Sequence, residues 1–311
     1  MFAVLLAVTG HTPPPAVWAA FVVVVLAVPV AAALVSVLAL RHVVDSPLDH
    51  VRRTSPDRGR RAALGSLLAA VLIATAGTLF LFPDGQGITP FALLVLGLVL
   101  LTGAGAVWVT GAFAAFMGRR LTLRAKSPAV LIAASRLAHD PWAAARTHAA
   151  LLLVTVVGVG FVGVRGVLLA SLEADGRRPV DLAFYTTGID LAGAAVLIAL
   201  AISLCGIAVG TAESLATRRG GLAAQVAAGV PHGVLARATL LETALPLAPA
   251  LLLAGAGGTV VYLAYATAVG TSVSLLPLLV PVAVHAACLL AAATSLPFLR
   301  RVAHPAELRF T

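Results

Sequence analysis

The sequence predicts an all-α polytopic membrane protein, a transmembrane helix bundle of about seven spans. Of its 311 residues, 60% are hydrophobic and only 11% are charged, and the mean hydropathy is +1.05. Soluble domains carry about a quarter charged residues. Apolar windows long enough to cross about 30 Å of hydrocarbon as helix recur along the chain. They are rich in Leu, Val and Ala without period-two alternation, which favours helices over a lipid-facing barrel.

The expected spans follow one another with short polar interruptions. They lie at residues 16–40, 62–82, 91–117, 147–170, 190–212, 239–268 and 274–297. A stub, residues 1–15, precedes the first span and lacks the basic start of a signal sequence. We expect this stub either to lie at the outer surface or to mark the shortened beginning of a longer ancestral protein.

Lysine and arginine are distributed unevenly between the expected loops. Of the 21 such residues, all but Arg165, Arg177 and Arg178 follow the first, third, fifth or seventh expected span. Because positive loops stay in the cytoplasm, the N-terminus is expected outside and the C-terminus inside. Loops facing anionic membrane lipids account for the net charge of +9, so no nucleic-acid partner is expected.

Two polar segments carry helix signals of their own. In the loop before the fourth span, Ser127 is a candidate N-cap with Pro128 at the first helical position, and Pro141 marks the end. An apolar stripe predicts that this helix lies on the inner membrane surface; it comprises Val130, Ala134, Leu137 and Trp142. The outer loop, residues 172–188, is too short for a folded domain.

The segment "TRRGGLAAQVAAGVPHGVLAR", residues 217–237, separates the fifth and sixth spans. Leu222, Val226 and Val230 recur at i, i+4 and i+8, which predicts a helix of about 11 residues with a narrow apolar ridge. Gly229 is placed to end it in the left-handed conformation, and Pro231 to start the next helix. The ridge could lie on lipid or press into a groove of a cytoplasmic partner, and periodicity alone favours neither.

The chain from Arg218 to Glu242 reads R-R-x-x-L-A-x-x-x-A-x-G-V-P-x-x-V-L-x-R-x-x-L-L-E, and the C-terminal tail contains "HPAELR". This motif, the order of the spans around it and the tail resemble the FtsX-like permeases, the membrane subunits of the macrolide-exporter class of ABC transporters. The resemblance covers residues 147–311 as one four-span unit with a cytoplasmic coupling loop at 212–238. Residues 16–146 would be a three-span end of a first unit plus the join. A tail-like sequence from Leu40 supports two related units.

The resemblance implies that the loop is a coupling helix that docks on a separate ABC ATPase subunit. It also implies ATP and Mg²⁺ in that subunit, a homodimer or a second permease chain as a further partner, and a bacterial cytoplasmic membrane. The implied docking positions are Arg218, Arg219, Leu222, Gln225, Val226, Gly229, Val230 and His232. The chain departs from the family in lacking charges at Gly221 and Val226, and in its short outer loop.

Other functions have less support in the residues. The chain is not expected to be an ATPase, because its one lysine, Lys126, lies outside any phosphate-binding motif. Neither a metal site nor a cofactor is expected, since the histidines lack ligand spacing. A non-transporting membrane regulator or scaffold that uses the same loop stays open, as does a secondary carrier.

Individual residues within the spans favour structural roles. We expect Glu242 to form an interfacial pair with Arg237, and His285 to bond a neighbouring helix. Asp190 and Arg165 lie near span ends, and Cys205 and Cys288 are expected to act as small apolar residues. Glycines in two spans are expected to permit close helix packing; they are Gly158, Gly160, Gly163, Gly255, Gly257 and Gly258.

Overall fold

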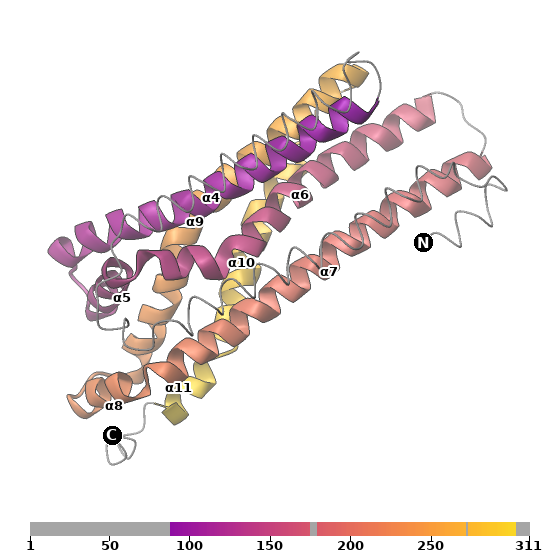
Figure 1. Ribbon diagram of the computed structural model, residues 1–311. Helices are drawn as coiled ribbons and strands as arrows, with labels where there is room; N and C mark the ends of the chain where they lie inside the picture. The colour runs from indigo at the N-terminus through magenta and orange to yellow at the C-terminus, as the bar shows by residue number, and fades with distance from the viewer. Residues whose placement is uncertain (1–87, 175–178, 272, 303–311) are drawn as a thin grey trace, which may run out of the picture. The chain divides into compact units, whose positions relative to one another are not determined.

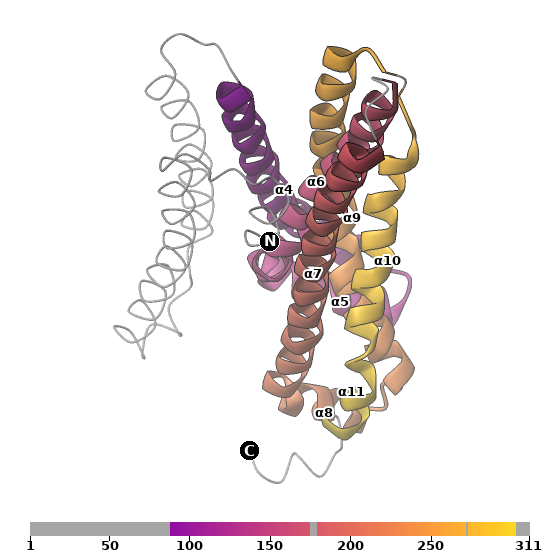
Figure 2. The ribbon, with the colours of Figure 1, turned by 90° about the vertical axis from the view of Figure 1, so that its right-hand side faces the viewer.

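The computed structural model describes residues 88–174, 179–271 and 273–302, all within one unit, Gly59–Thr311. The stub, the first two expected spans and the end of the tail lie outside these residues. Within them the chain is helical and contains no strand. The helices in Figures 1 and 2 are α4 (Ile88–Arg124), α5 (Pro128–His139), α6 (Pro141–Ala174), α7 (Pro179–Thr217), α8 (Arg219–Ala227), α9 (His232–Val269), the 3₁₀ turn η2 (Leu276–Leu278), α10 (Leu279–Ala293) and α11 (Leu296–Val302).

Five stretches are long and apolar enough to cross a membrane, which confirms a multi-pass membrane protein. They are Gly97–Arg124, Pro141–Leu172, Tyr185–Thr217, His232–Thr267 and Leu276–Leu299. Each contains or overlaps one of the last five expected spans. The helices extend well past the apolar windows, to 39 residues in α7, because backbone hydrogen bonding continues into the polar interface while hydropathy marks only the hydrocarbon part.

The core of the described bundle is formed mainly by α4, α6 and α9, with α10 on one side. Leu151 and Leu152 of α6, Leu247 and Leu251 of α9, and Cys288 of α10 share one buried cluster. Helix α7 packs on α6 and α10, yet only 6% of its apolar window is buried. An apolar helix with so little of its surface covered is suited to contact lipid directly.

Glycines set how closely these helices approach, as expected. A Cβ at Gly258 of α9 would lie 2.6 Å from the backbone oxygen of Val156 on α6, and one at Gly255 would lie 2.6 Å from Pro281 of α10. A Cβ at Gly257 would meet Thr102 of α4. The six expected positions therefore include contacts of α9 with α4, α6 and α10, and a side chain there would force the helices apart.

Helix α5 begins and ends where the sequence predicts. Pro128 occupies the first turn after Ser127, whose backbone is extended, although the Ser127 hydroxyl makes no capping hydrogen bond. The position of α5 differs from the expectation. It packs on α4 and α9 through a buried face that includes Ala133, Ala134 and Leu137, so this helix is part of the bundle and does not merely rest on the membrane surface. Small alanines on that face permit the close approach.

The expected boundary between residues 146 and 147 falls inside α6, which begins at Pro141. Helix α4, assigned by the sequence to the preceding region, packs against α6 and α9. In the described part of the chain the expected four-span unit and the helix before it therefore form one packed body. The expected outer loop is also mostly helical, since α6 continues to Ala174 and α7 starts at Pro179.

Candidate functional site

The elements that surround the predicted coupling loop converge at one end of the bundle, which we call the α8 end. Apolar clusters there join the C-terminal part of α7, α8, the N-terminal part of α9, α5 and α11 (Figure 1). Arg165 pairs with Asp190 at 2.9 Å between α6 and α7, toward their other ends. The described basic residues other than Arg165 lie in the elements of the α8 end, at the C-terminal end of α4 and in the segment that joins it to α5, or at the start of α6. Which side of the membrane this end faces stays a prediction of the charge distribution.

Helix α8 ends before Gly229 as its sequence predicts, but it is shorter than the expected helix of about 11 residues. It is nine residues long, and Gly229 follows it with φ +89°. The Val230 amide donates to the Gln225 carbonyl and the Gly229 amide to the Val226 carbonyl, a pair of bonds that ends a helix when the residue after it is left-handed. Pro231 is the N-cap of α9 with extended backbone. The left-handed turn thus fixes the direction in which the chain enters α9.

The apolar ridge of α8 faces the protein. The Leu222 side chain is 1% exposed and lies in a cluster with Leu215, Leu235 and Leu299, against which Val226 and Val230 also pack. Besides Leu222 of α8, the buried residues of this cluster come from α7, α9 and α11. Leu222 is covered by its own chain and so is not accessible to a partner in this structure, whereas Val226 and Val230 are only partly buried. Whether the ridge contacts a second protein stays a prediction.

The eight implied docking positions divide into two groups. The first group faces the chain itself. It contains the ridge residues, Arg218, which turns toward Glu242, and Gln225, whose side-chain oxygen is buried without a hydrogen-bond partner among the described residues. Arg219 and Gly229 are exposed, and half-buried His232 lines a shallow pocket between α9, α10 and α11. Only part of the predicted set can therefore contact a second protein directly.

The outward face of α8 consists of small residues that the sequence interpretation did not select. Gly221, Ala224, Ala227 and Ala228 are exposed and recur at intervals of three and four residues, so they share one side of the helix. They lie opposite the ridge. The helical period could have identified this face. If the apolar ridge of a surface helix packs on its own protein, the residues on the opposite side of the helix are exposed.

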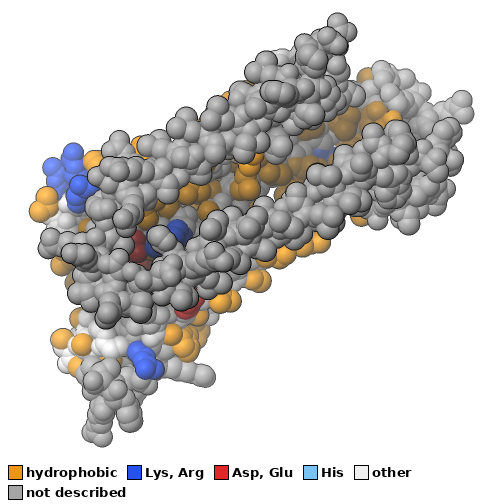
Figure 3. Space-filling model, viewed as in Figure 1, with side chains coloured by type: hydrophobic (Ala, Val, Ile, Leu, Met, Phe, Trp, Pro, Cys, Tyr) orange, Lys and Arg blue, Asp and Glu red, His pale blue; other side chains and the backbone are white. Residues whose placement is uncertain are grey.

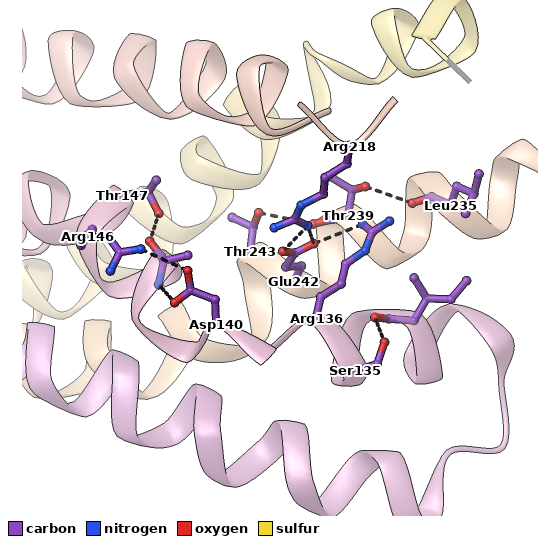
Figure 4. Close-up of polar contacts among 12 residues, drawn as sticks. Ser135, Arg136, Asp140, Arg146, Thr147, Arg218, Leu235, Thr239, Glu242 and Thr243 are labelled. Carbon is purple, nitrogen blue, oxygen red and sulfur yellow. Dashed lines mark hydrogen bonds and ion pairs between the residues drawn. The ribbon is translucent and has the colours of Figure 1, made fainter. Parts of the chain in front are cut away.

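Glu242 joins three elements at this end (Figure 4). Its carboxylate accepts hydrogen bonds from Arg218 at 2.9 and 3.3 Å and from Arg136 of α5 at 3.3 Å. The Glu242 side chain is 23% exposed, and those of Arg136 and Arg218 are 15% and 37% exposed. A half-buried carboxylate between two guanidiniums is held more firmly than a surface ion pair. The cluster ties the α7–α8 junction to α5 and α9.

The expected pair between Glu242 and Arg237 is wrong. Residues five apart on a helix are separated by roughly 140° around its axis, and Arg237 is exposed while Glu242 points into the α8 end. Arg136, 106 residues earlier in the chain, takes the place that Arg237 was expected to fill. No pattern within α9 could have indicated this partner, because it comes from another helix.

His285 has a neighbour that the sequence did not indicate. His148 of α6 is 4% exposed and lies within electrostatic range of His285 on α10. The His148 Nδ1 contacts the Ala144 carbonyl at 2.6 Å, while its Nε2 and the His285 Nδ1 are buried without a hydrogen-bond partner among the described residues. Those residues contain no group of three or more ligands that could hold a metal ion, and both cysteines are free thiols.

Comparison with protein-family models, with curated proteins and with solved structures gives no significant match. The resemblance to the FtsX-like permeases therefore rests on the residues from Arg218 to Glu242, on the order of the spans and on the tail.

Proposed function

We propose that the chain is the permease subunit of an ABC transporter, in which α8 receives movement from a separate ATPase subunit and passes it to the membrane helices. The observation that carries the proposal is the attachment of α8: a short helix between two long spans, fixed to its own bundle on one side and exposed on the other. The motif from Arg218 to Glu242 supplies the resemblance, and the attachment of α8 supports the proposed mechanical role.

Two connections would transmit a displacement of α8. The first is apolar, from Leu222 to the ends of α7, α9 and α11. The second is ionic, from Arg218 through Glu242 to Arg136, and continues through α5 to α4, because the backbone of Ala138 approaches Gly118 so closely that a Cβ there would lie 2.5 Å from the Ala138 nitrogen. Packed helices transmit such a displacement as a shift of whole elements.

The docking surface follows from the exposed residues. We assign it to Gly221, Ala224, Ala227, Ala228 and Gly229. Without large side chains, this face allows the backbone of a partner to come close, as small residues do where helices cross. It replaces the ridge residues as the proposed contact. Gly221, where many family members have a charged residue, then belongs to a face without charged or large side chains.

The remaining parts of the proposal concern the assembly. ATP and Mg²⁺ would bind to the partner, and this chain would contribute no catalytic residue. A second permease chain, identical or related, would complete the transporter in a bacterial cytoplasmic membrane. A non-transporting regulator that uses the same α8 surface is the alternative, and it differs in leaving ATP turnover independent of any transported compound.

Co-purification tests the proposal. The full chain is co-expressed with the ABC ATPase subunits of its own organism, as wild type, as Ala224→Glu, and as Ala183→Glu, the same change at an exposed position near the opposite end of α7. We expect wild type and Ala183→Glu to retain an ATPase subunit and Ala224→Glu to lose it, with unchanged melting temperature in all three. Retention by none, or loss by Ala183→Glu alone, would overturn the proposal.

A further inference from the structure

The C-terminal end of α4 carries basic and apolar side chains that the proposed function does not use. Arg119, Arg120, Arg124 and Lys126 are exposed, and none of them belongs to an ion pair in the described residues. Between Asp84 and Asp140 the sequence contains no acidic residue, and Asp140 itself pairs with Arg146 at 3.1 Å. The chain therefore offers these four cations no nearby carboxylate within this stretch.

Apolar side chains stand beside the cations. Leu123 is 86% exposed and Phe116 is 46% exposed. Phe116, Arg120 and Leu123 recur at i, i+4 and i+7, so they share one face of α4, and the Arg120 guanidinium carbon lies 5.0 Å from the centre of the Phe116 ring. Figure 3 shows Lys and Arg side chains next to hydrophobic ones at the end of the bundle where α4 terminates. Large apolar side chains exposed beside cations indicate a surface that contacts something other than water.

The depth of this surface is set by α4 itself. The helix has 37 residues and is about 55 Å long, and its apolar stretch from Gly97 leads directly into the cations. If this apolar stretch crosses the roughly 30 Å hydrocarbon layer, the cations at the C-terminal end of α4 lie at the level of the phospholipid headgroups. Helix α5 holds the end of α4 in place through the close approach of Gly118 and Ala138.

We propose that the end of α4 binds an anionic phospholipid of the leaflet at the α8 end. Arginine presents a planar set of donors that matches a phosphate group, and the face formed by Phe116 and Leu123 provides apolar contact for the upper acyl chain. A nucleic acid or a soluble phosphate would use the cations but would leave Leu123 in water. The inference is independent of whether an ATPase subunit binds α8.

Native mass spectrometry of the full chain, released from bilayer discs with equal phosphatidylglycerol and phosphatidylcholine, tests the proposal. Wild type is expected to retain phosphatidylglycerol selectively. Arg120→Gln with Arg124→Gln should weaken that retention about 30-fold, from the usual contribution of a cation near an anionic surface. The matched control removes two exposed cations elsewhere at the same end, Arg146→Gln with Arg237→Gln, and should keep the selectivity.

A second variant tests the apolar half of the surface. Leu123→Gln removes an exposed apolar side chain without touching the core, so helix content should not change. It should weaken phosphatidylglycerol retention several-fold, and millimolar glycerophosphate should not displace the lipid. Equal retention of both lipids, equal loss in the control pair, displacement by glycerophosphate, or retention of an acidic protein at this surface in place of lipid would each overturn the proposal.

Discussion

The Arg218 guanidinium, at the junction of α7 and α8, donates a hydrogen bond of 2.9 Å to the Glu242 carboxylate on the first third of α9. The two residues are the first and the last of the motif that the sequence singled out, and although 24 positions apart in sequence they join the two sides of α8. Arg136 binds the same carboxylate from α5. The motif therefore encodes a fastening of α8 to its bundle in addition to any surface for a partner.

Removing the shared carboxylate should loosen this fastening. We expect Glu242→Gln to lower the melting temperature of the purified chain by a few degrees, because it leaves two half-buried guanidiniums side by side. Arg237→Gln removes an exposed charge on the same helix and should change the melting temperature by less than about 1 °C. Equal effects of the two substitutions would mean that Glu242 has no special partner.

A double-mutant cycle then isolates the pair. Arg218→Gln and Glu242→Gln, alone and together, should show a coupling energy of about 1 kcal/mol or more in chemical or thermal unfolding. Additive effects within about 0.3 kcal/mol would contradict the ionic connection from α8 to α9.

The inward direction of the α8 ridge has a consequence for the isolated chain. Leu222→Asp should reduce its stability by several kcal/mol, because a carboxylate would be buried among leucines without a partner. Ala224→Asp, two residues later on the exposed face, should have a small effect. A Leu222→Asp chain that melts like wild type would show that the ridge is free, and would restore it as a docking surface.

Glycine substitutions should have opposite signs at two positions in the spans. Gly258→Ala should destabilise the chain by about 1–3 kcal/mol, because the new methyl group would meet the backbone oxygen of Val156. Gly166→Ala, in α6 with nothing within 4 Å of the added Cβ, should be neutral or stabilise by up to about 1 kcal/mol, because alanine favours the helix. Thermal unfolding in one detergent distinguishes the two. Destabilisation by both would argue against the packing of α6 on α9.

The described helices followed closely from local sequence. Hydropathy located the last five spans, and Pro128, Gly229 and Pro231 located the short helices, since the physical causes of these features lie within a few residues of them. The lengths of the membrane-spanning helices were underestimated, because an apolar window does not mark where backbone hydrogen bonding stops.

The site was predicted less completely, because its main interactions join distant segments. The period of Leu222, Val226 and Val230 identified an apolar face, but periodicity does not say whether lipid, a partner or the chain itself covers it. The partner of Glu242 was misassigned to Arg237 because the guanidinium that binds it, Arg136, comes from a helix 106 residues away. The neighbour of His285 was missed for the same reason.

The most direct measurement of the central proposal is site-specific photo-crosslinking in cells. A benzoyl-phenylalanine residue is incorporated at Ala224 on the exposed face of α8, or at Ala183 as the matched position at the far end of α7. Adducts are identified by mass spectrometry. A crosslink from Ala224 to a protein with an ABC ATPase phosphate-binding motif, absent from Ala183, is the result that the account predicts. No ATPase adduct at Ala224, or equal adducts at both positions, would contradict it.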